Sequence, residues 1–156
     1  MELTGSRTIR APRETVWARL NDAETLKACI PGCEELTGSA EDGFEAVVKQ
    51  KVGPVKATFK GAVTVSDAHP PESYRIAGEG KGGVAGFAKG GADVKLTEVP
   101  EGTELNYVVD AKVGGKIAQL GSRLIDSFAS KMADTFFENF KDQVEGESVT
   151  PQDPVT

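Results

Sequence analysis

Histidine and cysteine are scarce in this chain of 156 residues, which contains one histidine and two cysteines. Catalysis by a histidine dyad or triad would have to use His69, which precedes two prolines and is better explained as an exposed turn residue. A zinc site would need further ligands at suitable spacing beside Cys29 and Cys33, and the sequence offers none. The chain is therefore predicted to have no metal site.

The two cysteines leave two alternatives open. A disulfide between Cys29 and Cys33 is geometrically conceivable, although Pro31 and Gly32 lie between them. A reduced, partly buried pair is favoured, as is usual for a protein of a reducing compartment.

An excess of positive charge is also missing. Lys and Arg number 18 against 24 Asp and Glu, giving a formal net charge of −6. Nucleic acid is therefore excluded as an expected partner, because phosphate binding requires clustered basic residues. The local basic group of Lys49, Lys51, Lys56 and Lys60 is interpreted as the solvated face of two strands.

No apolar run approaches the ~20 residues that span a bilayer. Residues 1–6 lack the charged and apolar regions of a signal peptide. We therefore expect a cytoplasmic protein, with peripheral contact at the inner face of the cell membrane as the remaining possibility.

The N-terminal part of the chain predicts a strand over residues 2–10 and then two short helices. Pro12 suits the first turn of the first helix, where its missing N–H is harmless. The apolar stripe of that helix is Val16, Trp17 and Leu20. Asn21 followed by Glu24 resembles a capping box for the second helix. Its buried side would be Ala23, Leu26 and Ile30.

Residues 33–113 alternate between apolar and polar side chains and predict about six strands joined by short turns. Short turns favour antiparallel neighbours, and the single apolar face requires a cover. That alternation places Tyr107 on the covered face and Arg75 and Asp110 on the other. Nothing in the spacing pairs acidic residues such as Glu79, Asp93 and Asp110 for catalysis, so they are interpreted as solvated carboxylates.

The cover is a predicted helix over residues 116–144, released by the break at Gly114 and Gly115. Its apolar stripe is Ile117, Leu120, Leu124, Phe128, Met132, Phe136 and Phe140. Gly121 falls within its first two turns, where a glycine costs about 1 kcal/mol, and we attribute it to close approach of a strand or ligand. Residues 1–144 thus form one domain, and residues 145–156 a polar, disordered tail.

Glycines are concentrated between residues 78 and 91, which suits bulges and a mobile mouth better than a flat sheet. A curved antiparallel sheet wrapped around a long helix would enclose a space with an apolar lining. The pattern therefore predicts an α+β container for an apolar ligand rather than a self-contained catalyst.

Several motifs in residues 1–140 resemble the CoxG family of carbon monoxide dehydrogenase subunits, within the SRPBCC superfamily, whose fold is the helix-grip (START/Bet v 1-like) fold. The most specific are Cys29-Ile30-Pro31-Gly32-Cys33 and Gly114-Gly115-Lys116-Ile117-Ala118-Gln119-Leu120-Gly121. The other matching pieces are Val52-Gly53-Pro54 with Phe59-Lys60-Gly61, the stretch 78–83, and Ala11-Pro12 with Val16-Trp17 and Leu20, a pattern shared across the wider superfamily.

The resemblance implies a non-catalytic accessory protein of a molybdenum-containing carbon monoxide dehydrogenase or related molybdenum hydroxylase. It also implies attachment of that enzyme to the membrane, or transport of a lipophilic ligand such as a quinone, and no covalently bound cofactor. The tail departs from members that anchor through it, because it is acidic and anionic surfaces repel it. Membrane contact is therefore expected at the glycine-rich mouth or the Lys49–Lys60 face.

A polyketide cyclase or aromatase-like enzyme, with Arg75, Tyr107 or Asp110 in the cavity, and a ligand-free assembly factor remain as alternatives. The positions we nominate as inward, ligand-binding residues are Trp17, Phe59, Phe87, Tyr107, Ile117, Leu120, Gly121, Leu124 and Phe128.

Overall fold

One antiparallel sheet of seven strands organises the chain. The computed structural model describes residues 1–152, with side chains as far as Glu145. The strands are β1 (Glu2–Ile9), β2 (Cys33–Ser39), β3 (Gly43–Val52), β4 (Val55–His69), β5 (Ser73–Lys81), β6 (Phe87–Val99) and β7 (Gly102–Gly114). Their order is β1-β7-β6-β5-β4-β3-β2, so every pair except β1 with β7 is consecutive along the chain.

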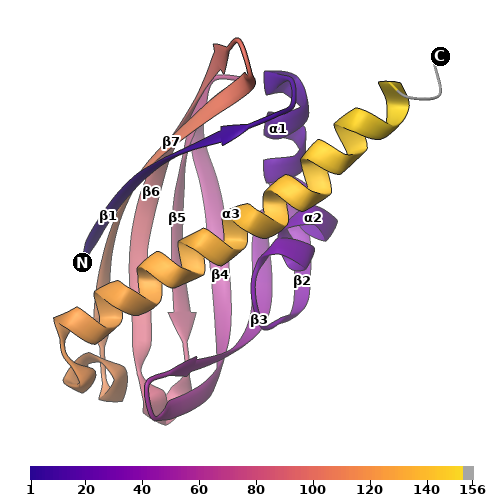
Figure 1. Ribbon diagram of the computed structural model, residues 1–156. Coiled ribbons are helices and arrows are strands. Elements are labelled where there is room, and N and C mark those ends of the chain that lie inside the picture. Colours follow the sequence, from indigo (N-terminus) through magenta and orange to yellow (C-terminus); the bar gives the residue numbers. More distant parts are fainter. Residues whose placement is uncertain (153–156) are drawn as a thin grey trace.

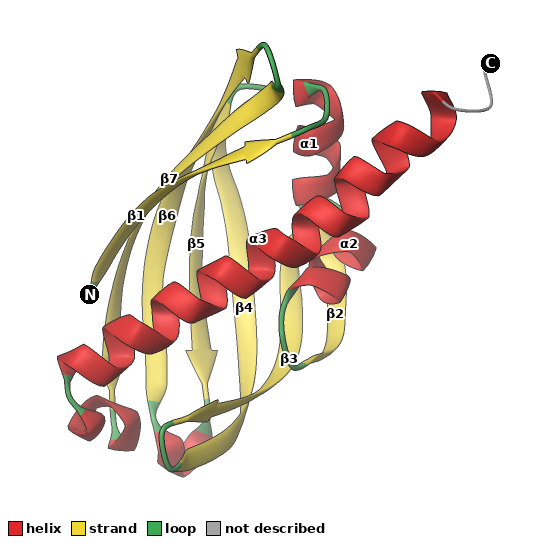
Figure 2. Cartoon of the chain, in the orientation of Figure 1, coloured by secondary structure: helices red, strands yellow, loops and turns green. Residues whose placement is uncertain are grey.

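The helices lie on the concave face of this curved sheet. The long helix α3 (Ser122–Gln152) crosses the face diagonally, and α1 (Arg13–Leu20) and α2 (Ala23–Cys29) lie beside its C-terminal half (Figure 1, Figure 2). Two short 3₁₀ helices, η1 (Gly83–Ala85) and η2 (Lys116–Leu120), lie at the opposite end. The predicted α+β helix-grip arrangement is confirmed.

The apolar core is divided into two clusters. The first, the α1 cluster, joins α1, the sheet and the C-terminal half of α3, and its largest fully buried side chain is Phe140. The second, the η2 cluster, is smaller and lies at the end that carries η1 and η2. Its buried members are Val52, Val55, Ala85 and Ile117. The long helix is thus packed on the sheet by different residues at its two ends.

The start of α2 corrects the predicted capping box. The N-cap is Asp22 rather than Asn21, and its side chain accepts hydrogen bonds from the backbone N–H of Thr25 at 3.0 Å and from the Thr25 hydroxyl at 2.7 Å. These bonds lower the pKa of Asp22, the side-chain bond to Thr25 contributing most. Asn21 instead follows α1, where its amide donates to the Trp17 carbonyl at 2.9 Å.

The predicted helix over residues 116–144 is interrupted at Gly121, so the prediction of one continuous helix was wrong. Gly121 has φ 94° and ψ 151°, a conformation that is almost restricted to glycine, and it separates η2 from α3. A Cβ at this position would have no neighbour within 4 Å. The glycine is therefore explained by its backbone angles and not by the close approach that the sequence suggested.

The long helix extends into the segment that was predicted as a tail, residues 145–156. The backbone of α3 continues beyond the predicted boundary at residue 144 as far as Gln152. Residues 153–156 lie outside the described residues. Among the described residues, no helix is long and apolar enough to cross a membrane.

Both cysteines are free, with Cys29 fully buried and Cys33 partly exposed.

Replacing Gly121 with alanine is expected to lower the free energy of unfolding by about 1–3 kcal/mol, because the backbone angles are strained for any residue with a Cβ. Chemical denaturation measures the change. Gly80→Ala is the control, since its Cβ would lie 4.0 Å from the nearest neighbour, Phe59, and the backbone there is not left-handed. Equal effects of the two substitutions would contradict the backbone explanation.

Candidate ligand cavity

A cavity of about 410 Å³ lies between the sheet and α3. Its floor comes from the concave face of the sheet, including Phe44, Val63, Ile76, Val94 and Val109. Its cover comes from α3 through Ala133, Phe136 and Phe137, and from the α1–α2 region through Leu20, Leu26 and Ile30. A volume of this size accommodates a small organic ligand.

The cavity wall is almost wholly apolar because the strands alternate. On β5, Tyr74 and Ile76 line the cavity while Arg75 points to the opposite face, where it forms an ion pair with Asp93 at 3.0 Å. On β7, Tyr107 and Val109 line it, and Asp110 is exposed. The predicted inward position of Tyr107 and outward positions of Arg75 and Asp110 are confirmed. The polar side chains on the wall are Asn21, Tyr74 and Tyr107.

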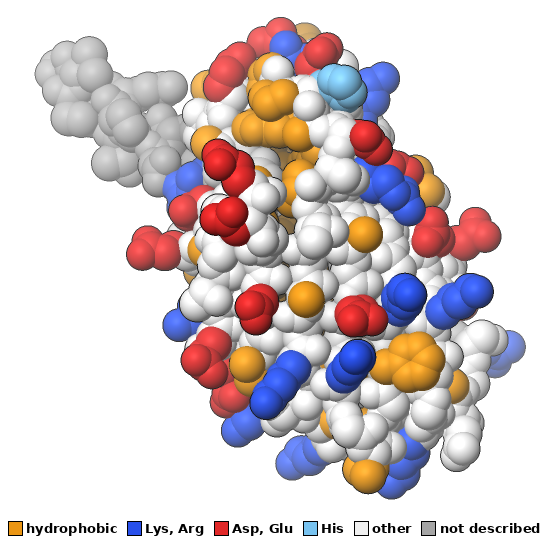
Figure 3. Space-filling model, turned by 180° about the vertical axis from the view of Figure 1, so that it is seen from behind, with side chains coloured by type: hydrophobic (Ala, Val, Ile, Leu, Met, Phe, Trp, Pro, Cys, Tyr) orange, Lys and Arg blue, Asp and Glu red, His pale blue; other side chains and the backbone are white. Residues whose placement is uncertain are grey.

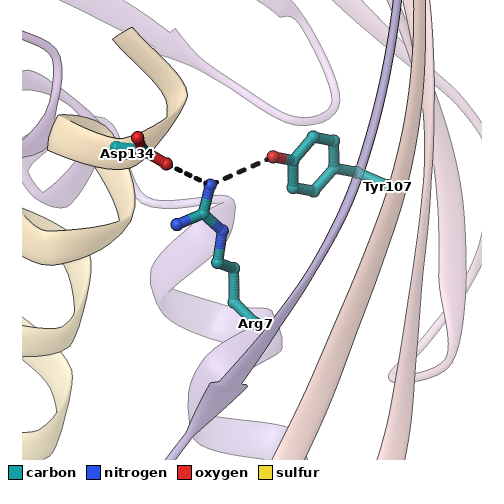
Figure 4. Close-up of polar contacts among 3 residues, drawn as sticks. All are labelled: Arg7, Tyr107 and Asp134. Atoms are coloured by element: carbon teal, nitrogen blue, oxygen red, sulfur yellow. Dashed lines mark hydrogen bonds and ion pairs between the residues drawn. The ribbon is translucent and has the colours of Figure 1, made fainter. Parts of the chain in front are cut away.

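Three polar side chains, Arg7, Tyr107 and Asp134, contact one another beside the cavity, between the sheet edge and α3 (Figure 4). Arg7 of β1 donates from Nη2 to the Tyr107 hydroxyl at 3.2 Å and to Asp134 Oδ1 at 2.7 Å. The Arg7 guanidinium also lies 5.2 Å from the centre of the Phe137 ring, which stacks on Tyr107. The hydrogen bond to Tyr107, followed by that to Asp134, raises the pKa of Arg7.

Gly5 makes this arrangement possible. It is paired with Tyr107 in the β1–β7 register, and the tyrosine ring lies over it. A Cβ at Gly5 would overlap the Tyr107 hydroxyl and ring. The bare backbone of the edge strand therefore leaves room for Tyr107 to extend across β1 to Arg7.

Of the nominated ligand-binding residues, only Tyr107 lines this cavity. Trp17 lies against the α1 cluster, with its ring 5.1 Å from that of Tyr74 in an edge-to-face contact. Phe59, Ile117, Leu120 and Phe128 come together in the η2 cluster. Ligand contact by any of these residues stays a prediction.

The remaining nominated positions lie at the same end as the η2 cluster. Leu124 and Phe87 are 38% and 46% exposed, respectively. Gly121 forms the turn between η2 and α3. The alternation that places Arg75 on the outer face implies that its neighbours Tyr74 and Ile76 lie on the covered face, and this was the available signal for lining residues that were not nominated.

Groups that could serve metal binding or catalysis are not gathered in the cavity. In the part of the chain that the structure describes, no three His, Cys, Asp or Glu side chains are placed to hold a metal ion. His69 is exposed at the end of β4, as predicted, and Glu79 forms a surface ion pair with Lys81 at 4.0 Å. What the site offers is apolar volume and a few hydroxyl and amide groups.

A curved antiparallel sheet holding a long helix, with an apolar cavity between them, defines a helix-grip protein. The chain belongs to the CoxG family of carbon monoxide dehydrogenase subunits, whose family model matches residues 5–145. A comparison with curated proteins finds no significant match.

Solved structures show the same architecture. A conserved protein from Geobacillus kaustophilus has 30% sequence identity and a TM-score of 0.87, over 94% of this chain and 96% of that one. A protein from Thermus thermophilus has 18% identity and a TM-score of 0.70, over 95% and 99% of the two chains. An uncharacterized protein from Rhizobium leguminosarum has 16% identity and a TM-score of 0.71, over 93% and 94%. The last two likenesses concern the fold alone.

Introducing a Cβ at Gly5 is expected to displace Tyr107 and lower the free energy of unfolding by about 1–3 kcal/mol, as overpacking usually does. Chemical denaturation of Gly5→Ala, Tyr107→Leu and the double variant measures the coupling. In the Tyr107→Leu background, the Gly5→Ala change should lower the free energy of unfolding much less. Additive effects would show that the ring over Gly5 is not the reason for the glycine.

Proposed function

We propose that this chain is a non-catalytic accessory protein that holds a lipophilic ligand, such as a quinone, in the cavity beneath α3. The observation that carries the proposal is the cavity of about 410 Å³ with an almost wholly apolar wall. Transfer of apolar ligand surface from water to such a wall contributes about 2.5 kcal/mol for each 100 Å² buried. The wall therefore favours a hydrophobic ligand without any strong polar contact.

The proposed partner enzyme is inferred from the family to which the chain belongs. Its name describes a subunit of carbon monoxide dehydrogenase, and the resemblance described above connects such proteins with molybdenum-containing enzymes. We extend this accessory role to the present chain and propose that it delivers or accepts its ligand beside such an enzyme. The cavity gives that role a physical basis, because a quinone-sized molecule needs shelter from water during transfer.

The outward positions of Arg75 and Asp110 disfavour a cyclase or aromatase-like activity, which would need convergent polar groups inside. An experiment distinguishes the proposed ligand carrier from a ligand-free assembly factor. If a variant with a filled cavity still supports the activity of the partner enzyme in full, assembly without ligand is the better description.

Filling the cavity is expected to abolish binding of an apolar fluorescent probe, N-phenyl-1-naphthylamine. Ala46 lines the cavity on β3, so Ala46→Phe should weaken probe affinity at least about tenfold through lost volume. Ala77→Phe is the matched control, since Ala77 follows the inward Ile76 on β5 and is exposed. Wild-type protein that fails to bind the probe, or equal binding by both variants, would overturn the cavity proposal.

A second observation favours peripheral contact with an anionic membrane. The β3–β4 turn, η1 and η2 meet at one end of the molecule, which we call the basic end. Its exposed lysines are Lys51, Lys56, Lys60, Lys81, Lys89, Lys112 and Lys116. The register brings Lys60 opposite Lys81, and Lys89 opposite Lys112. The basic end thus brings residues of the glycine-rich stretch 78–91 together with Lys51, Lys56 and Lys60 of the predicted lysine face, whereas Lys49 is paired with Glu34.

Hydrophobic side chains are exposed within the basic end. Val84 of η1 is 92% exposed, and Phe87 and Leu124 are partly exposed near it in the fold. From behind, the sheet shows Lys and Arg gathered in the lower part of the view around an exposed hydrophobic side chain (Figure 3). Lysines attract anionic lipid and an exposed apolar tip inserts at the headgroup boundary, so this end suits a bilayer despite the net charge of −6.

Sedimentation with phosphatidylglycerol-containing vesicles tests the membrane contact. Lys112→Gln with Lys116→Gln is expected to weaken binding about thirtyfold, because each lysine near an anionic surface contributes about 1 kcal/mol. The control pair, Lys27→Gln with Lys95→Gln, alters the net charge equally away from the basic end. Equal losses for the two pairs, or equal binding to neutral phosphatidylcholine vesicles, would overturn this orientation.

A further inference from the structure

Two tyrosines lie in one row across the cavity face of the sheet. The register pairs Gly5 with Tyr107, Tyr107 with Val94, and Val94 with Tyr74. Strand spacing therefore separates the backbones of Tyr74 and Tyr107 by about 10 Å, with Val94 between them. Both side chains line the cavity.

The hydroxyl groups of these tyrosines differ in their partners. The Tyr107 hydroxyl accepts a hydrogen bond from Arg7 at 3.2 Å. Among the described residues, no hydrogen-bond partner is found for the Tyr74 hydroxyl, although the residue is only 7% exposed. Within the described part of the chain, the aromatic ring that contacts Tyr74 is that of Trp17, which meets it edge to face. The Tyr74 hydroxyl thus has no protein partner, and it is not among the fully enclosed polar atoms of the described residues, so it keeps accessible surface although the residue as a whole is buried.

Phenylalanine would pack on the cavity wall equally well, so the Tyr74 hydroxyl adds a polar group that no protein partner uses. Burial raises the pKa of Tyr74, and no hydrogen bond contributes to the shift. The group is therefore a neutral hydroxyl at physiological pH and can act as a donor. A ligand that brings an acceptor oxygen to this point would satisfy it.

We propose that the Tyr74 hydroxyl is the polar anchor of the cavity and donates a hydrogen bond to an acceptor oxygen, such as a carbonyl, on an otherwise apolar ligand. The inference rests on the proposed ligand-binding function and specifies the ligand chemistry. The acceptor oxygen lies at the end of the cavity nearest Trp17, and the apolar body extends along the wall formed by residues such as Val63 and Ile76. Tyr74 selects for an oxygen at that position, whereas the aliphatic and phenylalanine side chains of the wall select only for apolar surface.

A matched pair of probes tests the anchor. The probes are 2-acetylnaphthalene and 2-ethylnaphthalene, which have similar shapes and differ in the carbonyl group, and their affinities are obtained by displacement of N-phenyl-1-naphthylamine. Tyr74→Phe should weaken binding of the ketone about three- to tenfold, the range expected for one neutral hydrogen bond, and leave the hydrocarbon within about twofold. Tyr107→Phe is the comparison variant: its hydroxyl accepts from Arg7 and its O–H can still donate, so loss of ketone selectivity in Tyr107→Phe instead of Tyr74→Phe would overturn the assignment to Tyr74.

An infrared measurement separates a hydrogen bond from a packing effect. The carbonyl stretch of bound 2-acetylnaphthalene should lie at lower frequency in wild-type protein than in Tyr74→Phe. Equal losses for both probes, or an unchanged carbonyl frequency, would overturn the anchor while leaving the cavity proposal intact. If wild-type protein binds neither probe, both proposals fail.

Discussion

The packing of α3 on the concave face of the sheet is the interaction on which the rest of the structure depends. The helix is held by the α1 cluster near its C-terminal half, where Phe137, Phe140 and Val144 are buried. Near its start it meets the separate η2 cluster through Phe128. A curved sheet and a long helix that meet through separate clusters at their two ends do not pack tightly along their whole length. The cavity lies against the α1 cluster. The packing that stabilises the fold and the cavity therefore come from the same pair of surfaces.

Sequence periodicity predicted the parts of this structure that depend on which face a side chain occupies. The period of two identified Tyr107 as inward and Arg75 and Asp110 as outward, and the helical stripe identified Phe140 as buried. Periodicity does not report depth or distance along the sheet. For that reason Phe59 and Phe128, which are apolar and inward, were nominated for the ligand site although they pack in the η2 cluster.

The remaining errors concern local backbone conformation. Gly121 fits a helical stripe in sequence, but its positive φ, which a hydrophobic pattern does not report, ends one helix and begins another. At α2, the adjacent Asn21 and Asp22 are both good caps, and the choice depends on Thr25, whose N–H and hydroxyl both donate to Asp22. Tyr74 was not nominated for a related reason, because a hydroxyl without a protein partner is recognised only when its neighbours in space are known.

The pairing of β1 with β7 has a consequence for how the protein is made. Gly5 and Arg7 are synthesised at the beginning of the chain, whereas Tyr107 and Asp134 follow about a hundred residues later and complete their contacts. The wall of the cavity and its polar border therefore close only when the last helix has left the ribosome. A partly synthesised chain that lacks α3 therefore has neither the cover of the cavity nor the Asp134 side of its polar border.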